Sequence, residues 1–263
     1  MHVDWVPSQV WSEGPKKREL ALGRVDVWRL RLDEARLDEA RPDEICLSPA
    51  EAQRGVLAPD ELARAARFHF DRDRVRFQRC RTALRFLLAR YLDIAPSDIR
   101  FAYGPSGKPE LDADQNRHEL RFNVSHSGDM ALIAFGIRNN LGVDIEKVRP
   151  DVNTAELSER YFSTRERESL RSLPEALRVI AFYTCWARKE AFLKATGEGL
   201  GFPLSDFSVA VHPEKAPSVE EIKGDTSPAR QWSLIDIKAA DGFRSAVAVE
   251  HPSVTLATFD LSE

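Results

Sequence analysis

Hydrophobic and polar positions along the 263-residue chain follow two periods, one typical of helices and one typical of short strands. Apolar residues recur at helical spacing from 59 to about 91, starting at Pro59 and Asp60, as expected for a helix N-terminus. Helical spacing returns from 154 to 196, with a break at Pro174. Short apolar runs predict strands at 25–32, 101–103, 122–125, 131–135, 142–146, 206–211, 232–238, 244–250 and 254–260.

This order of elements predicts an α+β fold, and its repetition of helices followed by strands suggests two similar halves. Stretches rich in proline, glycine, serine or charge are expected to be irregular: an extended or loosely packed lead-in before residue 23, a loop or short helix at 33–44, and a mobile hairpin loop at 213–230. The predicted divisions are an N-terminal extension over 1–22, an N-terminal half over 23–140 and a C-terminal half over 141–263.

Composition narrows the class of protein. The chain is 43% hydrophobic and 30% charged with a net charge of −4, which fits a globular protein and does not mark the whole chain as a polyanion binder. Cys46, Cys80 and Cys185 are far apart, so a disulfide framework or a thiolate zinc site is not expected, and a reducing cytoplasm fits. The N-terminus lacks the order of a signal peptide, and no apolar run approaches the ~18 residues of a membrane span.

Two acidic residues alternate with two apolar ones in the strand predicted at 142–146. Val143 and Ile145 should point to one face, and Asp144 and Glu146 to the other. Two neighbouring carboxylates repel each other and need solvent, a basic partner or a metal, and ligands made only of oxygen favour Mg²⁺, Ca²⁺ or Mn²⁺ over zinc. A short D-x-E pattern is common, so a solvated strand face is the alternative.

The strongest helical stretch of the C-terminal half, residues 179–196, presents Trp186, Glu190 and Lys194 on one face. Glu190 and Lys194 are four residues apart in the favourable order for an ion pair. Such a pair on a surface contributes only ~0.3–0.5 kcal/mol. The functional interpretation is an acid and a base presented together beside a large aromatic ring.

A polar segment, Asn123 to Gly128, separates two apolar strands. A turn there could offer backbone N–H groups, hydroxyls and the His126 imidazole to a phosphate. A nucleophilic pair of Ser125 and His126 is not favoured, because adjacent side chains rarely point at each other and no G-x-S-x-G motif surrounds the serine. A plain hydrogen-bonded turn remains the alternative.

Arginines are concentrated in the first long helical stretch. Nine arginines between 64 and 90 stand against two aspartates, a local balance of +7. Arginine binds phosphate with forked geometry, so the stretch could hold a nucleotide phosphate or bind nucleic acid, or it could be a solvated helix face. The nine arginines are Arg64, Arg67, Arg72, Arg74, Arg76, Arg79, Arg81, Arg85 and Arg90.

Four motifs in a fixed order carry a family resemblance: G-K-P at 107–109, F-N-V-S-H-S-G at 122–128, G-V-D-I-E at 142–146 and W-A-R-K-E-A-F-L-K at 186–194. With them the chain resembles the Sfp-type 4′-phosphopantetheinyl transferases, from about 60 to 210 and more loosely from 25 to 250. The resemblance implies two α+β halves related by a pseudo-twofold, with coenzyme A bound between them. It also implies transfer of the 4′-phosphopantetheine arm to a serine of an apo acyl or peptidyl carrier protein, with release of 3′,5′-ADP.

The resemblance also implies roles for individual residues. The metal ligands would be Asp144, Glu146 and Glu190, holding Mg²⁺ or Mn²⁺. Coenzyme A would be contacted by Arg64, Arg76, Lys108, Ser125, His126 and Lys194. Lys194 would stabilise or protonate the leaving group, and Glu190 or Glu166 would take the proton of the carrier serine. One further basic position of the family is Glu61 in this chain, which departs from the pattern.

These implications predict a cytoplasmic monomer that acts on a carrier protein and coenzyme A, without nucleic acid or membrane, in fatty acid or secondary metabolite biosynthesis. Two alternatives accompany them. One is a nucleic-acid-binding module that uses the arginine-rich stretch, which would leave the acidic strand without a role. The other is a non-catalytic carrier-protein binder, against which the presence of every expected carboxylate argues.

Overall fold

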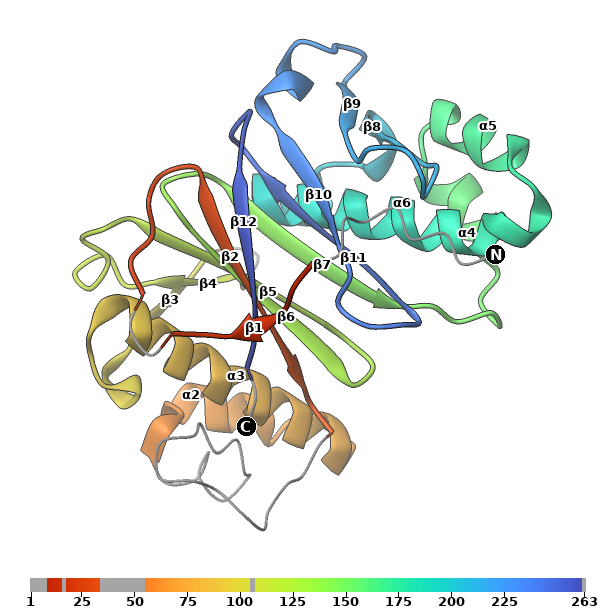
Figure 1. Cartoon of the computed structure of the whole chain (residues 1–263). Coiled ribbons are helices and arrows are strands. Elements are labelled where there is room, and N and C mark those ends of the chain that lie inside the picture. Colours follow the sequence, from red (N-terminus) through yellow and green to blue (C-terminus); the bar gives the residue numbers. More distant parts are fainter. Residues whose placement is uncertain (1–8, 16–17, 34–54, 105–106, 262–263) are drawn as a thin grey trace.

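The structure is a computed structural model that describes residues 9–15, 18–33, 55–104 and 107–261. Most of the segment predicted as a loop or short helix at 33–44, and Cys46, lie outside these residues. Helices cover the two outer sides of a pair of sheets (Figure 1), which confirms the α+β class. Within the described ranges, no helix is both long enough and apolar enough to cross a membrane.

In the described residues, the N-terminal half begins with one long strand and continues with two helices, a small hairpin and two further strands. Its elements are β2 (Arg24–Arg31), α2 (Pro59–Ala65), α3 (Asp71–Leu92), β3 (Phe101–Tyr103), β4 (Pro109–Leu111), β5 (Leu120–Ser127) and β6 (Met130–Ile137). Strand β6 lies between β2 and β5 and is antiparallel to both.

The C-terminal half repeats this order. Its elements are β7 (Leu141–Lys147), α4 (Thr154–Tyr161), α5 (Thr164–Ser172), α6 (Glu175–Thr196), β8 (Phe207–Val209), β9 (Val219–Ile222), β10 (Ser233–Ile237) and β11 (Phe243–Val249). Strand β11 lies between β7 and β10 and is antiparallel to both, as β6 is in the first half. Each half therefore builds the same pattern: a strand, helices, a small hairpin and two antiparallel strands. Short 3-10 turns lie at 96–98, 199–201, 204–206 and 228–231.

Both ends of the described chain belong to the first sheet, although β12 lies within the predicted C-terminal half. Strand β12 (Thr255–Asp260) runs parallel to β2, and β1 (Ser12–Glu13) runs parallel to β12 on its other side. Figure 1 shows β12 crossing from the second half to lie beside β2. The lead-in is also held by side chains: Gln9 contacts the backbone of Asp236 and Lys238 at 2.9 Å each, so this part of the extension is not loosely packed.

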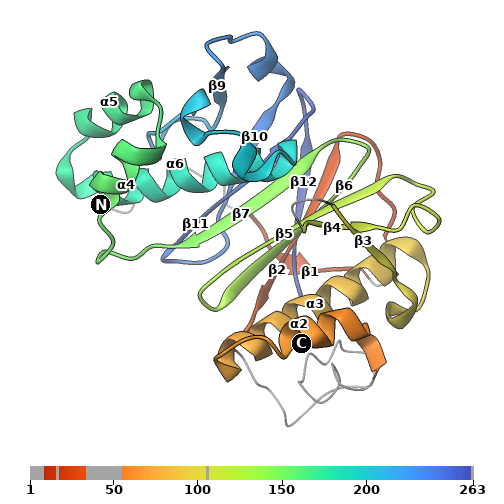
Figure 2. The same cartoon turned by 180° about the vertical axis from the view of Figure 1, so that it is seen from behind.

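Three apolar cores separate the layers. One joins α3 to the first sheet through Trp28, Leu84 and Phe135, and another joins α6 to the second sheet through Phe192 and Ala246. The third lies between the sheets and contains Val25, Val27, Leu132, Val143, Ile145 and Val247. The two sheets thus meet face to face, with α3 outside one and α6 outside the other (Figure 2).

Two predicted irregular segments are more regular than expected. The polar segment is mostly strand: β5 continues to Ser127, and only Gly128 and Asp129 form the turn to Met130. The loop predicted at 213–230 contains β9, which pairs with β8. In both cases backbone pairing with a neighbouring strand, which local composition does not report, decides the structure.

Candidate active site

Strand β7 places its two acidic residues against α6. Val143 and Ile145 enter the core between the sheets, as the alternation predicts, so Asp144 and Glu146 face the opposite side. Gly142 allows α6 to approach closely, because a Cβ at this position would lie 2.0 Å from the carbonyl oxygen of Ala191. The absence of a side chain therefore brings the last turns of α6 onto the acidic strand.

Asp144 is the buried centre of the site, with 3% of its surface exposed. Its Oδ1 accepts hydrogen bonds from Lys194 Nζ at 2.6 Å and from Ser125 Oγ at 2.9 Å. Its Oδ2 is buried and has no hydrogen-bond partner in the structure. A buried carboxylate oxygen without a donor is costly, and a cation is one way to satisfy it.

Glu146 and Glu190 share the electrostatic field of Asp144. Burial away from water is the main cause that raises the carboxyl pKa of both glutamates, and the negative charge of Asp144 is the second. The hydrogen bond from Ser127 is the main influence that lowers the pKa of Glu146, and the positive charge of Lys194 lowers that of Glu190. Ser127 Oγ donates to Glu146 Oε2 at 3.0 Å. The negative charge gathered here exceeds what one ammonium balances.

A cavity of about 360 Å³ lies beside this cluster, where the two halves meet. It is lined by Gly107, Lys108, Pro109, Phe122, Asn123, Val124, Glu190, Leu193, Lys194, Gly197 and Gly199. The ammonium of Lys108 donates to the carbonyl of Lys194 at 2.8 Å, which ties the G-K-P loop to the end of α6. Burial lowers the pKa of Lys108. Two lysines and one glutamate therefore border a single hollow.

The predicted phosphate ligands lie in different surroundings. Ser125 is buried and bonded to Asp144 and Lys194. His126 is on the opposite face of β5, where partial removal from water and the charge of Lys194 lower its imidazole pKa. Arg76 is paired with Asp33 through two hydrogen bonds of 2.6 and 2.5 Å, and Arg64 lies over the ring of Phe77 at 5.5 Å from its centroid. Neither arginine lines the cavity.

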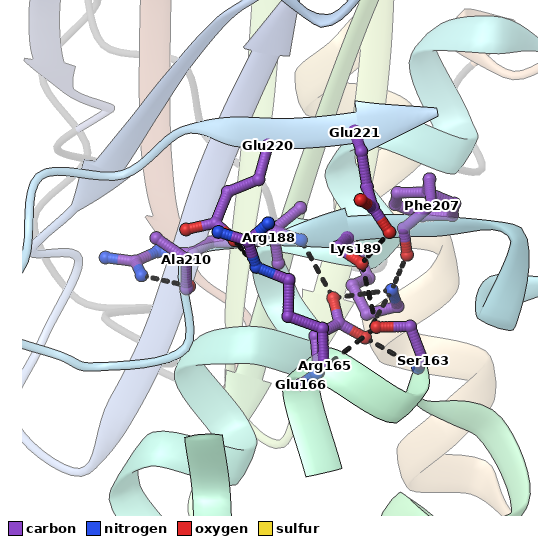
Figure 3. Close-up of polar contacts among 11 residues, drawn as sticks. Ser163, Arg165, Glu166, Arg188, Lys189, Phe207, Ala210, Glu220 and Glu221 are labelled. Atoms are coloured by element: carbon purple, nitrogen blue, oxygen red, sulfur yellow. Dashed lines mark hydrogen bonds and ion pairs between the residues drawn. The ribbon is translucent and has the colours of Figure 1, made fainter. Parts of the chain in front are cut away.

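Glu166 does not line the cavity. Its carboxylate lies among polar groups of neighbouring segments inside the protein (Figure 3). It is 1% exposed, and its two oxygens accept from Lys189 Nζ at 2.7 and 2.8 Å, from Val209 N at 2.8 Å and from Ser163 N at 2.9 Å. Lys189, also buried, joins the same cluster. Three donors thus make four hydrogen bonds to the two oxygens of Glu166. These contacts give Glu166 a structural setting, and the role implied by the resemblance stays a prediction.

The departure from the family pattern at Glu61 also has a structural account. Glu61 is 1% exposed and accepts from Arg81 Nε and Arg85 Nε at 2.6 Å each, and from Ala58 N at 2.9 Å. Arg79 is buried as well and donates to the carbonyl of Leu32 at 2.6 Å. Three of the nine arginines are thus internal, which weakens the interpretation of the stretch as a nucleic-acid surface.

The donor chemistry at the acidic cluster fits a hard divalent cation. All three candidate ligands are carboxylates, one oxygen of Asp144 is buried without a partner, and two of the carboxyls have raised pKa values. No group of three or more His, Cys, Asp or Glu side chains in the described part of the chain is close enough to hold a metal as it stands. The ammonium of Lys194 occupies the other oxygen of Asp144.

Sequence reasoning missed three contributions to this site. Gly142 was not recognised as the contact point for α6. Ser127 was placed in the turn although it lies on β5, and neither Asn123 nor Ser127 was expected to accept a hydrogen bond from β7. The signal was present in the alternation of polar residues at 123, 125 and 127, which is the period of a strand.

Comparison with known proteins shows the family. The model described as "4′-phosphopantetheinyl transferase, N-terminal" matches residues 49–137, and that of the "4′-phosphopantetheinyl transferase superfamily" matches 140–248. The 4′-phosphopantetheinyl transferase HetI of Nostoc sp. is 36% identical over 239 residues, covering 91% of this chain and 93% of HetI. The 4′-phosphopantetheinyl transferase Sfp of Bacillus subtilis is 31% identical over 208 residues, covering 78% of this chain and 88% of Sfp. The chain therefore belongs to the 4′-phosphopantetheinyl transferases, as its resemblance to the Sfp type predicts, and is an enzyme of that family.

Proposed function

We propose that this enzyme transfers the 4′-phosphopantetheine arm of coenzyme A to a serine of an apo acyl or peptidyl carrier protein, in a Mg²⁺-dependent reaction that releases 3′,5′-ADP. The observation that carries the proposal is the convergence of Asp144, Glu146, Glu190 and Lys194 beside a cavity between the halves. In the reaction, the serine oxygen forms a bond to the β-phosphorus, and the bond from this phosphorus to the oxygen of the leaving 3′,5′-ADP breaks.

The cationic side chains support binding of the pyrophosphate. Lys108 and Lys194 both line the cavity, and Lys108 is linked to the backbone of Lys194. Lys194 reaches Asp144 and Ser125 in the free protein and is 30% exposed, so its ammonium can turn toward a bound phosphate. There it would offset the charge that gathers on the leaving group or donate a proton to it. Arg64 and Arg76 would contribute at the 3′-phosphate once their present contacts are exchanged.

Asp144, Glu146 and Glu190 would hold Mg²⁺, or Mn²⁺ in its place. When bound, the ion would neutralise phosphate charge and orient the two phosphates. Asp144 offers the unpartnered Oδ2, and Ser127 holds Glu146. Glu190, which lines the cavity, would also accept the proton of the carrier serine, directly or through a water. Its raised pKa brings it closer to the range of an effective general base at neutral pH.

We propose that the enzyme works in the cytoplasm, as a monomer. Cys80 and Cys185 are buried free thiols, which suits a reducing cytoplasm. Since both halves of the cavity come from one chain, we propose that the enzyme acts as a monomer. Its partner would be a carrier protein of fatty acid or secondary metabolite biosynthesis.

The test is intact-mass measurement of apo carrier proteins after incubation with the enzyme, coenzyme A and Mg²⁺, with EDTA as a control. A gain of one phosphopantetheine unit that EDTA prevents is expected. Asp144→Asn should remove this gain while circular dichroism shows an unchanged fold, because the variant loses the buried charge that Lys194 and the cation share. Full activity in EDTA would refute the metal requirement. No gain with any carrier would refute the transfer.

A further inference from the structure

A line of side chains on β5 takes the place of backbone pairing along the free edge of β7. Strand β5 pairs with β6 and β7 pairs with β11, and the two strands are not partners of each other in either sheet. The free N–H groups of β7 instead meet side chains. Val143 N donates to Asn123 Oδ1 at 3.0 Å, Ile145 N to Ser125 Oγ at 3.4 Å, and Lys147 N to Ser127 Oγ at 3.0 Å.

The two serines of this line have a second contact. While each hydroxyl oxygen accepts a β7 N–H, its proton is donated to the preceding acidic residue. Ser125 Oγ donates to Asp144 Oδ1 at 2.9 Å, and Ser127 Oγ donates to Glu146 Oε2 at 3.0 Å. Because side chains two residues apart on a strand point the same way, Ser125 and Ser127 of β5 make the same contact with successive carboxylates of β7. The N-terminal half therefore orients the carboxylates of the C-terminal half.

We propose that Ser127 is a positioning residue that orients the Glu146 carboxylate for the divalent cation. Its hydroxyl is anchored by Lys147 N, which fixes the direction of the remaining O–H toward Glu146. Ser127 does not line the 360 Å³ cavity, and its hydroxyl bonds Glu146 and Lys147, whereas the hydroxyl of Ser125 also bonds Lys194. The inference rests on the proposed metal dependence.

The expected effect follows from what such supporting hydrogen bonds contribute elsewhere. Loss of a hydrogen-bond partner of a metal-binding side chain typically weakens metal binding about 10- to 100-fold. Ser127 is half-buried, and in Ser127→Ala the second oxygen of Glu146 could still bind the cation. We therefore expect an effect at the lower end of this range, with an affinity for the cation about 10-fold weaker than that of the wild type. Ser127→Thr retains the hydroxyl and suits a strand, and should bind the cation as the wild type does.

The experiment measures Mn²⁺ binding directly, by electron paramagnetic resonance of free Mn²⁺ in titrations of the full chain without coenzyme A. Wild type, Ser127→Ala, Ser127→Thr and the exposed control Ser172→Ala are compared, each after its thermal unfolding has been recorded. The expected result is weaker binding for Ser127→Ala alone. In turnover assays the same variant should need about 10-fold more Mg²⁺ for half its maximal rate, and saturating Mg²⁺ should restore that rate.

Each other outcome overturns the inference in a distinguishable way. If Ser127→Ala binds Mn²⁺ within twofold of the wild type, the serine only joins the strands, and the proposed metal site stands. If saturating Mg²⁺ does not restore its rate, the hydroxyl acts on the reaction by another route. If the wild type binds no Mn²⁺, the proposed metal site itself fails, and the inference fails with it.

Discussion

Replacing Glu166 with glutamine tests whether this residue is structural. The Glu166 carboxylate receives only donors: the Lys189 ammonium at both oxygens, Val209 N at Oε1 and Ser163 N at Oε2. Glutamine has nearly the same shape but carries an NH₂ group in place of one oxygen. In either orientation that NH₂ faces two donors, and the buried Lys189 charge loses its counter-charge.

The size of the effect follows from burial. Both side chains of the ion pair are 1% exposed, so solvent cannot replace the lost partner. Removing one member of a buried pair typically costs about 3–5 kcal/mol. A domain is usually stable by about 5–15 kcal/mol, so Glu166→Gln should lose a large part of its folding free energy. The Lys189 ammonium also donates to the Phe207 carbonyl at 2.6 Å, and this contact should remain.

Urea unfolding followed by circular dichroism measures the change by linear extrapolation. Glu168→Gln is the matched control, since it lies exposed on the same helix α5 and should change stability by less than about 0.5 kcal/mol. Turnover of Glu166→Gln, measured where it is still folded, should approach that of the wild type. A variant of unchanged stability without turnover would refute the structural role and restore the catalytic one.

Three further predictions concern the site and its supports. Glu190→Gln should stabilise the protein in EDTA at pH 8, because the raised carboxyl pKa of Glu190 means that its negative charge is less favourable in the folded than in the unfolded state. This gain in stability should vanish below about pH 4.5, where the carboxyl group is protonated in the folded and the unfolded protein alike. Urea unfolding at several pH values measures the difference. Gly142→Ala should cost about 1–3 kcal/mol and reduce turnover, because its Cβ would collide with the Ala191 carbonyl; equal stability in urea would contradict the close approach. Arg18→Ala should cost about 1.5–3 kcal/mol in the same assay, because it removes hydrogen bonds of 2.6 and 2.9 Å to fully buried Asp26; no change would show that the N-terminal segment is dispensable.

Local periodicity determined much of the site. Alternation along 142–146 was enough to place Asp144 and Glu146 on one face, because a strand turns successive side chains to opposite sides. Helical spacing likewise placed Glu190 and Lys194 on neighbouring turns of α6. Motif order then identified the family, since each motif alone was short and common.

Contacts between distant segments decided the rest. The pairing of β12 with β2, the burial of Glu166 against Lys189 and the contact of Lys194 with Asp144 join residues far apart in the chain. No pattern within a few residues distinguishes a carboxylate that faces a cavity from one that is enclosed by donors. The sequence by itself determined which residues share a face, because that follows from backbone geometry. Only the tertiary structure decided what that face meets, and therefore which carboxylates remain available for chemistry.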